Sequence, residues 1–414
     1  MTNALKNNNE KPMPLEGIRI IEFGIFVTGP GAASILGELG ADVVKIESWL
    51  GDPARLQVNR IGKIPPLTFK NGESMYYRMT NCNKKAICID VSKKKGREIL
   101  NRLIRDADVF ITNLRKSTKT KLGVDYMNLS KVNSRIIYAS ISGYGPEGPM
   151  EDHGAYDPLG LAYSGMMYMI GSSEPVHVPP PGALLDQATA ISASHAILTA
   201  LLVRERQGIG QEVHVSLYST GMWLMYYNLM AAYTLSRSAT PWIRREHTPL
   251  GGYSRCKDGK WIIGIHHPEQ KYWPAFCEAT GQTTLLQDPR FADEERRLEN
   301  CAELLTIFDQ VFATKTRDEW VEILSVKGLM FVKVQDINEI QDDPQALINH
   351  YIVDFEDPYL GKVKVPGYPI HFSANRAGIQ SFGPTLGEHT DLIMRQMGYT
   401  DQEVKILKEE SVIK

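Results

Sequence analysis

The sequence predicts an α/β protein in which helices cover both faces of a mostly parallel sheet, together with a smaller α+β domain. Two observations lead to this fold class. Short runs rich in Val and Ile alternate with longer helical stretches through the first half of the chain. This alternation is typical of β-α-β units, whose ligands bind beyond the carboxyl ends of the strands. The segment 226–335 then has a hairpin and helices of its own, and 414 residues suffice for two or three domains.

The first β-α-β unit is expected within residues 17–47. GIRIIEF predicts a strand, AASILGELGA after the GPG at 29–31 predicts a helix, and DVVKIE predicts a second strand. The pattern recurs as AICIDV at 86–91, a helix at 94–107, DVFIT at 108–112 and a strand within 135–145.

The later elements follow from similar signals. A long helix is expected from Asp186 to Glu205, because Gly208 and Gly210 follow it as helix-ending residues. Residues 1–13 are polar and are expected to form a flexible tail. The other expected elements are a strand at 212–218, an apolar helix at 221–235, a hairpin turned at Asp258 and Gly259, a helix at 317–327 capped by Thr316, a hairpin at 352–372 and a helical end from 387.

The charge and composition give no reason to expect nucleic-acid or membrane partners. The net charge is −2 and the pI is about 6.6, so no long-range field draws a polyanion. No stretch reaches the ~18 apolar residues of a membrane span, and the polar N-terminus lacks the apolar core of a signal peptide. The five cysteines form no CxxC pair, which favours a reducing compartment. We therefore expect a cytoplasmic protein.

Asp186 stands alone between the apolar pair Leu184 and Leu185 and a long helical run of small residues. An aspartate at this point can cap the helix by accepting bonds from its free N–H groups. The same carboxylate could instead act as a nucleophile at a strand-to-helix turn. The local sequence leaves both roles open, and capping is the commoner one.

Ligand signals are uneven along the chain. The first turn, GIFVTGPG, argues against a nicotinamide cofactor, because its glycines lack the G-x-G-x-x-G spacing. The histidines lack metal-ligand spacing, so no metal site is expected. Basic residues gather near two successive strands, where they are either solvated or bind phosphate; their placement favours binding. They are Lys84, Lys85, Lys93, Lys94 and Lys95, and then Arg115, Lys116, Lys119 and Lys121.

Several longer segments occur in an order that resembles one known family. They are LEGIRIIEFGIFVTGPGAASILGELGADVVKIES, NCNKKAICIDVSKKKGREIL, ADVFITN, RIIYASISGYGPEGP, YDPLGLAYSGMM, the stretch around Asp186, RERQGIGQEVHVSLY and PTLGEHTDLIMRQMGY. From about residue 15 to 410 the chain resembles the class III CoA-transferases, which include formyl-CoA, carnitine and bile-acid CoA-transferases. The α-methylacyl-CoA racemases are fold relatives of this family.

The resemblance implies a Rossmann-like large domain built from 14–225 and 336–414, with the small domain 226–335 between, and two ring-like subunits interlocked as a homodimer. It implies a CoA-transferase without a tightly bound cofactor, whose substrates are an acyl-CoA and a carboxylic acid. Asp186 would then be the nucleophile, forming aspartyl anhydride and aspartyl-CoA thioester intermediates. Its position at a helix N-terminus would lower the pKa of its carboxyl and keep it ionised.

The resemblance also implies binding residues. CoA contacts are expected at Val27, Thr28, Ile89, Asn113 and Lys121, with Lys93 or Lys116 compensating for Ser48 and Ser142, which stand where the formyl-CoA enzyme has basic residues. Oxyanion donors are expected among Gly29, Gly31, Gly251 and Gly252, and a substrate contact at Tyr156. Independently of the resemblance, Glu246 and His247, in a loop of the small domain, are expected to make polar contacts with the substrate.

Two other functions stay open. A racemase of this fold needs a histidine before an aspartate, but the corresponding pair here is Tyr156 and Asp157, and His153 lies three residues away. A non-catalytic CoA-binding protein is the third possibility. One helix either packs in a core or lines an acyl pocket, and the pocket would suit an acid with a medium apolar body. Its apolar residues are Met222, Trp223, Met225, Tyr226, Tyr227 and Met230, with Met166, Met167 and Met169 nearby in sequence.

Overall fold

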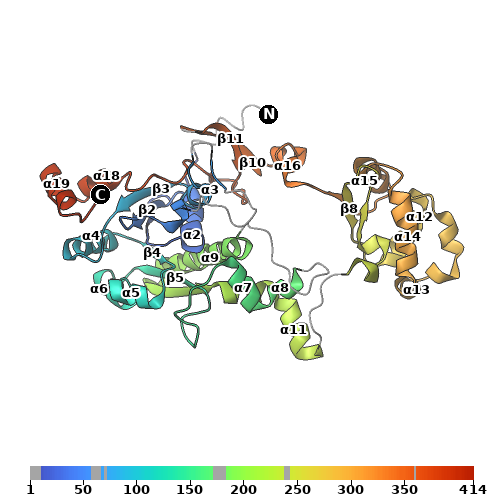
Figure 1. Ribbon diagram of the computed structural model, residues 1–414, viewed down its shortest axis with the longest axis horizontal. Coiled ribbons are helices and arrows are strands. Elements are labelled where there is room, and N and C mark those ends of the chain that lie inside the picture. The colour runs from blue at the N-terminus through green and yellow to red at the C-terminus, as the bar shows by residue number, and fades with distance from the viewer. Residues whose placement is uncertain (1–10, 57–66, 70–71, 171–182, 237–242, 359) are drawn as a thin grey trace. The chain divides into compact units, whose positions relative to one another are not determined.

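The computed structural model describes residues 11–56, 67–69, 72–170, 183–236, 243–358 and 360–414, which fall into two compact units (Figure 1). Unit 1 comprises Met1–Tyr168, Val178–Ala239 and His350–Lys414, and unit 2 comprises Met169–His177 and Thr240–Asn349. Unit 1 therefore combines both ends of the chain. The unit limits at 239 and 349 differ from the expected limits at 225 and 335.

Unit 1 contains a six-stranded sheet in the order β3-β2-β1-β4-β5-β6, and all five neighbouring pairs are parallel. This is the strand order of a Rossmann fold, with its switch point between β1 and β4. Five of the six residues of β2 are buried, as expected for a sheet covered on both faces. The strands are β1 (Arg19–Glu22), β2 (Asp42–Glu47), β3 (Lys84–Cys88), β4 (Val109–Thr112), β5 (Ile137–Ser142) and β6 (Gln211–Ser216).

Two helical layers cover this sheet and form separate cores. Helices α2 and α9 pack on one face, where Leu36, Ala193 and Ile197 are buried against β1, β4 and β5. Helices α4, α6, α18 and α19 supply the other core, which includes Leu100 and Ile393. The bounds are α2 (Thr28–Glu38), α4 (Lys94–Arg105), α6 (Tyr126–Val132), α9 (Leu184–Gln207), α18 (Thr390–Gln396) and α19 (Asp401–Glu409).

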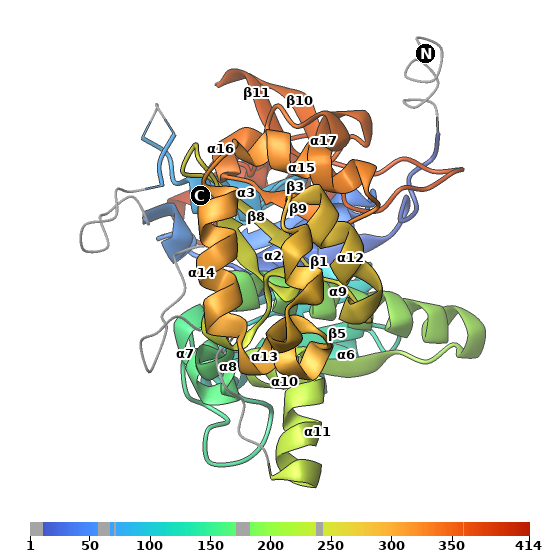
Figure 2. The same ribbon diagram turned by 90° about the vertical axis from the view of Figure 1, so that its right-hand side faces the viewer.

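The remaining elements of unit 1 are shorter, and two of them, β10 and β11, belong to its C-terminal segment His350–Lys414. Helix α11 has no buried residue and projects away from the sheet of unit 1 (Figures 1 and 2). Strands β10 and β11 form an antiparallel hairpin. The bounds are η1 (Pro53–Leu56), α3 (Met75–Thr80), α5 (Lys116–Leu122), α7 (Asp157–Ser164), α8 (Met166–Met169), α10 (Leu217–Leu224), α11 (Tyr226–Leu235), β10 (Ile352–Asp357) and β11 (Gly361–Pro366).

Unit 2 has a three-stranded antiparallel sheet in the order β7-β8-β9, with helices packed on an aromatic core. Trp273, Phe276, Phe308 and Phe312 are almost fully buried in this core. Its elements are η2 (Arg244–Glu246), η3 (Pro249–Gly251), β7 (Tyr253–Arg255), β8 (Trp261–Gly264), α12 (Glu269–Ala279), η4 (Thr283–Gln287), η5 (Pro289–Phe291), α13 (Glu294–Glu299), α14 (Cys301–Phe312), α15 (Arg317–Val326), β9 (Phe331–Val334), α16 (Ile337–Ile340) and α17 (Pro344–Ile348).

Several local predictions are confirmed. DVVKIE matches β2 at both ends, Gly208 ends α9 with a positive φ of 74°, and Thr316 caps α15 in a capping box with Glu319. The hairpin of β7 and β8 turns at Gly259, whose φ is also positive.

Other local predictions were wrong. The helix expected at 221–235 is two helices, because the chain breaks at Met225. Residues 1–10 of the expected tail lie outside the described part. The tail does not extend to residue 13, since the Pro12 carbonyl accepts a bond from the Arg376 N–H.

Candidate functional site

A cavity of about 1230 Å³ lies at the carboxyl ends of the sheet strands in unit 1. Its lining comes from the turn after β1, the start of α5 after β4, the end of β5 with the loop that follows, and strand β6. Asp186, Val27, Thr28, Asn113, Lys116 and Tyr156 all contribute to this lining. Six residues expected to be functional therefore share one cavity, at the switch point where a sheet of this order binds ligands.

Asp186 is the third residue of α9 and not its cap, which corrects the capping hypothesis. The N-cap position belongs to Ala183, which makes no side-chain cap bond. Asp157 performs the capping instead, because its Oδ1 accepts bonds from the N–H groups of Leu185 at 2.6 Å and Asp186 at 2.9 Å. The carboxylate that satisfies this helix end comes from the start of α7. The Asp186 side chain is thereby left for the cavity.

The pKa of Asp186 is raised to about 7, the opposite of the lowering expected from the helix N-terminus. Burial of the carboxyl is the larger cause, and the negative charge of Asp157 adds to it. Loss of water disfavours the charged form by more than the helix dipole favours it. Asp186 therefore exchanges its proton near neutral pH.

The first turn of the sheet is held by Asn113 and Asp52. The Asn113 Oδ1 accepts a bond from the Ile25 N–H, and its Nδ2 donates to the Ile25 carbonyl and to the Thr28 hydroxyl. Phe26 has a positive φ of 61°, and its N–H donates to Asp52 at 3.0 Å. Asn113 uses its amide to shape the turn that carries Val27 and Thr28.

Gly29 and Gly31, expected as oxyanion donors, have packing roles. A Cβ added at Gly31 would lie 3.1 Å from the Ala190 Cβ, so the glycine lets α2 approach α9. The Gly31 N–H already donates to the Val27 carbonyl at 2.6 Å. A Cβ added at Gly29 would lie 3.2 Å from the Asn113 amide group.

A buried ionic network supports the turn and corrects the expectation for Lys84. Lys84 is fully buried, not solvated, and donates to Glu22 at 3.2 Å and to the Pro30 carbonyl at 2.7 Å. Lys45 contacts both Glu22 and Asp52. Burial outweighs the attraction of Glu22 and lowers the pKa of Lys84 to about 8. This lysine therefore holds the start of α2 and has no place in a phosphate-binding surface.

Several expected CoA contacts lie away from the cavity or already have partners. Ile89 is buried and pairs with Ile413, and Lys93 donates to the carbonyls of Glu410 and Ser411. Lys121 and Ser48 are exposed, and neither contributes to the cavity lining.

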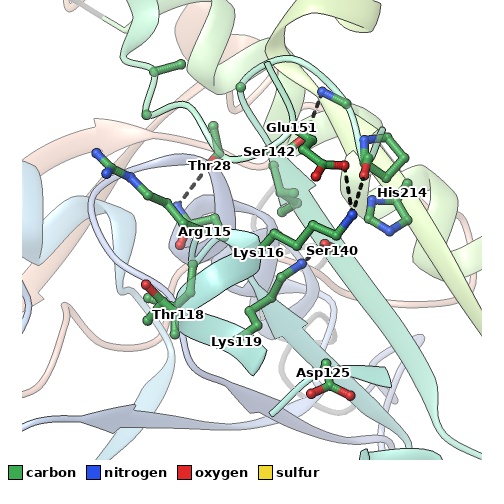
Figure 3. Close-up of a pocket in the computed structure, with 18 of the residues that line it drawn as sticks. Thr28, Arg115, Lys116, Thr118, Lys119, Asp125, Ser140, Ser142, Glu151 and His214 are labelled. Carbon is green, nitrogen blue, oxygen red and sulfur yellow. Dashed lines mark hydrogen bonds and ion pairs between the residues drawn. The ribbon is translucent and has the colours of Figure 1, made fainter. Parts of the chain in front are cut away.

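Two others do line the cavity. Lys116 is paired with Glu151 at 2.8 Å, and the Ser142 hydroxyl accepts a bond from the Gly145 N–H (Figure 3). The Lys116 ammonium therefore already has a carboxylate partner within the cavity.

The remaining candidates divide between the units. Glu246, His247, Gly251 and Gly252 belong to unit 2 and are not part of the cavity lining in unit 1. In unit 1, His153 lines the same cavity as Asp186, and Tyr156 contacts Phe26 edge to face.

The apolar helix segment is not a core, which corrects the packing alternative. Met225 is buried, whereas Trp223 and Tyr227 are 74% and 85% exposed. These side chains therefore form an apolar surface on α10 and α11.

Sequence reasoning missed the capping role of Asp157 and three polar residues that line the cavity, Ser140, Glu212 and His214. Lys119, which lines it too, was among the basic residues expected to bind. Lys119 donates to the Ser140 hydroxyl at 2.6 Å (Figure 3). His214 lies 3.1 Å from Glu212. A signal for the strand residues exists, because polar side chains recur at alternate positions of β5 and β6. Alternate residues of a strand share one face. Polar groups on such a face of a covered sheet indicate a cavity.

Within the described residues no group of three or more His, Cys, Asp or Glu side chains could hold a metal ion. No described helix is long and apolar enough to cross a bilayer. All five cysteines are buried and free.

Comparisons with known proteins give a consistent result. The profile of CoA-transferase family III matches residues 15–390. An acyl-CoA transferase of Fusarium pseudograminearum is 31% identical over 99% of this chain and 90% of its own length. A succinyl-CoA:glutarate CoA-transferase of Mus musculus is 30% identical over 96% of this chain and 89% of its own length. The crystal structure of a CAIB/BAIF family protein from Brucella suis superimposes with a TM-score of 0.81 at 26% identity, covering 94% of this chain and all of that one.

Proposed function

The chain belongs to CoA-transferase family III, and from this premise we propose that it moves CoA from an acyl-CoA to a free carboxylic acid with Asp186 as the nucleophile. The observation that carries the proposal is the placement of the Asp186 carboxylate. It lines the cavity beside the start of α2, and Asp157, not Asp186, satisfies the helix end. A helix-capping carboxylate is bonded to the backbone, whereas an uncommitted one is free to attack a thioester.

The reaction then proceeds by acyl exchange at one carboxyl group. An Asp186 oxygen attacks the thioester carbon, and CoA thiolate leaves, which gives a mixed anhydride. The thiolate attacks the aspartyl carbonyl carbon, releasing the donor's carboxylate and forming the aspartyl-CoA thioester. A carboxylate oxygen of the incoming acid attacks the aspartyl carbonyl carbon of this thioester and expels CoA thiolate, which gives a second anhydride. The thiolate then attacks the acid's carbonyl carbon, which forms the new acyl-CoA and releases the Asp186 carboxylate.

The pKa of Asp186, raised to about 7, is compatible with this role. The ionised form attacks, so the first step is faster above this pH. A carboxylate that burial has made costly to ionise is also poorly solvated, and attack on the thioester relieves this cost. Asp157 contributes by keeping the pKa high and by bonding the backbone of the first turn.

The turn after β1 is proposed to hold the pantetheine arm of CoA. Val27 and Thr28 line the cavity, and the N-terminus of α2 offers N–H groups near them. Phe26, Tyr156 and Leu159 line the same cavity and suit an acid with an apolar body.

A covalent-adduct experiment tests the nucleophile. The protein is incubated with a donor acyl-CoA without acceptor, digested, and the Asp186 peptide is examined by mass spectrometry. We expect the mass of a CoA thioester on this peptide, and none in Asp186→Asn. An unmodified peptide together with full transfer activity in Asp186→Asn would contradict the proposal. Exchange of an α-proton with deuterated water without an acceptor acid would indicate the racemase alternative, in which His153 is the residue to test. CoA binding without an adduct and without proton exchange would indicate a non-catalytic CoA-binding protein.

We also propose that the chain functions as a homodimer, with α10 and α11 in the interface. Tyr226, Tyr227, Tyr233 and Trp223 are all more than half exposed, and no residue of α11 is buried. Aromatic side chains are typical of the buried centre of an interface. Light scattering after size-exclusion chromatography tests this, and a monomer at micromolar concentration would contradict it. Tyr227→Glu should weaken the association.

A further inference from the structure

The Lys119 ammonium is a buried charge without a counter-ion. Lys119 is 8% exposed and contributes to the lining of the cavity. It donates one bond, to the Ser140 hydroxyl at 2.6 Å, and no described carboxylate lies within ion-pair distance of it. An ammonium group has three hydrogens to donate, so two remain available. A buried charge normally requires an opposite charge.

The acidic residues of the same cavity are already engaged. Glu151 is bound by Lys116 at 2.8 Å, and Glu212 lies 3.1 Å from His214. Asp125 caps α6 through the Asn128 N–H at 3.1 Å and also accepts from the Asn128 side-chain amide. Burial lowers the pKa of Lys119 despite the attraction of Glu212 and Asp125, so these carboxylates do not compensate its burial.

The geometry favours a ligand over a purely structural role. Figure 3 shows Lys116 and Lys119 extending from the same helix toward Ser140 and His214. Ser140 is fully buried on β5, so its hydroxyl orients the ammonium without exposing it to bulk water. Ammonium groups and hydroxyls together bind carboxylate and phosphate oxygens.

We propose that Lys119 and Ser140 form a subsite for an anionic oxygen group of a bound substrate, at a point in the cavity separate from Asp186. This inference rests on the proposed function for the identity of the substrates. The shared chemistry is an oxyanion, and its source is either a second carboxylate of the substrate acid or a phosphate of CoA. In the first case, the acid has an apolar body with carboxylates at both ends.

Kinetics of Lys119→Met distinguish the two sources. Acceptors are α,ω-dicarboxylic acids and monocarboxylic acids of equal chain length, and donors are thioesters of CoA and of 3′-dephospho-CoA. Loss of a charge-assisted bond should raise KM about tenfold or more for the group that Lys119 binds. A rise confined to dicarboxylic acids assigns the subsite to the acid. A rise in the donor KM that is smaller for 3′-dephospho-CoA thioesters than for CoA thioesters assigns the subsite to a CoA phosphate. A rise in the donor KM that is equal for both donors, whichever acid is the acceptor, also assigns it to a CoA phosphate.

Two controls separate binding from folding and from the transferase proposal. Lys405→Met removes a lysine that is 69% exposed on α19 and should leave both KM values unchanged. Ser140→Ala should shift the same KM as Lys119→Met by a smaller factor. Calorimetric titration of the acids and CoA thioesters into wild type and Lys119→Met measures binding even if no Asp186 adduct forms. Unchanged KM and binding constants in a folded Lys119→Met protein would overturn the subsite, whereas a missing adduct in wild type would overturn only the transferase mechanism.

Discussion

Removing the charge of Asp186 should stabilise the protein at alkaline pH. The pKa of this carboxyl rises from 3.8 to about 7 on folding, so the folded state prefers its protonated form. In the unfolded chain the Asp186 carboxyl ionises at lower pH. Above that pH, folding must therefore either return a proton to Asp186 or bury its negative charge. Asp186→Asn has nearly the same shape without this cost. Active-site groups often reduce stability in this way.

The size of the effect follows from the pKa shift. At about 1.36 kcal/mol per pKa unit, the raised pKa of Asp186 lowers the free energy of unfolding by about 2 kcal/mol at pH 5, where folding takes up a proton, and by about 4 kcal/mol at pH 8, where folding buries the charge. The cost is absent below pH 3.8, grows with rising pH, and is constant above about 7. The gain in the free energy of unfolding should therefore be roughly 4 kcal/mol at pH 8 and about 2 kcal/mol at pH 5.

Urea unfolding of wild type and Asp186→Asn at pH 5, 6.5 and 8 measures this gain. Circular dichroism reports the transitions, and the comparison is made on the transition of unit 1. The exposed Asp106, changed to asparagine, serves as control and should alter the free energy of unfolding by less than about 0.5 kcal/mol at every pH. A variant that is no more stable than wild type at pH 8, or whose gain is independent of pH, would refute the reasoning.

Three further results are expected. The rate of adduct formation with a donor acyl-CoA should rise through about pH 7 and level off above it. Asp157→Asn should move this rise to lower pH, because the variant removes a negative charge beside Asp186. A rate that is independent of pH from 5 to 8 would count against the raised pKa of Asp186. Glu22→Gln should lower the free energy of unfolding by about 3–5 kcal/mol, measured in urea, because Lys45 and Lys84 lose a buried partner; a change below 1 kcal/mol would contradict this. Gly31→Ala should cost about 1–3 kcal/mol by pressing a methyl group on Ala190, whereas Gly72→Ala meets no neighbouring atom but has a positive φ and should cost about 1 kcal/mol.

The elements of the fold were largely predictable because their causes are local. Runs such as DVVKIE are apolar over the length of a strand, and β2 has the same bounds. Thr316 and Glu319 form a capping box from residues three positions apart, so no distant partner is needed. The order of the segments carried the family resemblance, and the family profile matches residues 15–390.

The site depended on partners that sequence distance conceals. Asp186 resembles a helix cap when only its neighbours are considered, but Asp157 of another helix takes that role and leaves Asp186 to the cavity. Lys84 belongs to a lysine-rich segment that resembles a solvated surface. In the structure it is buried, where it donates to Glu22 and to the Pro30 carbonyl. Lys119 gains meaning only where β5 places Ser140 beside it.

The sequence by itself therefore determined the α/β class, the strands and helices and the family, all of which follow from periodicity and motif order. The tertiary structure alone decided which charges are buried, which are paired and which have no counter-ion. The reason is that hydrogen bonds and burial depend on distances between segments far apart in the chain. Those distances set the pKa of Asp186 and leave Lys119 without a counter-ion.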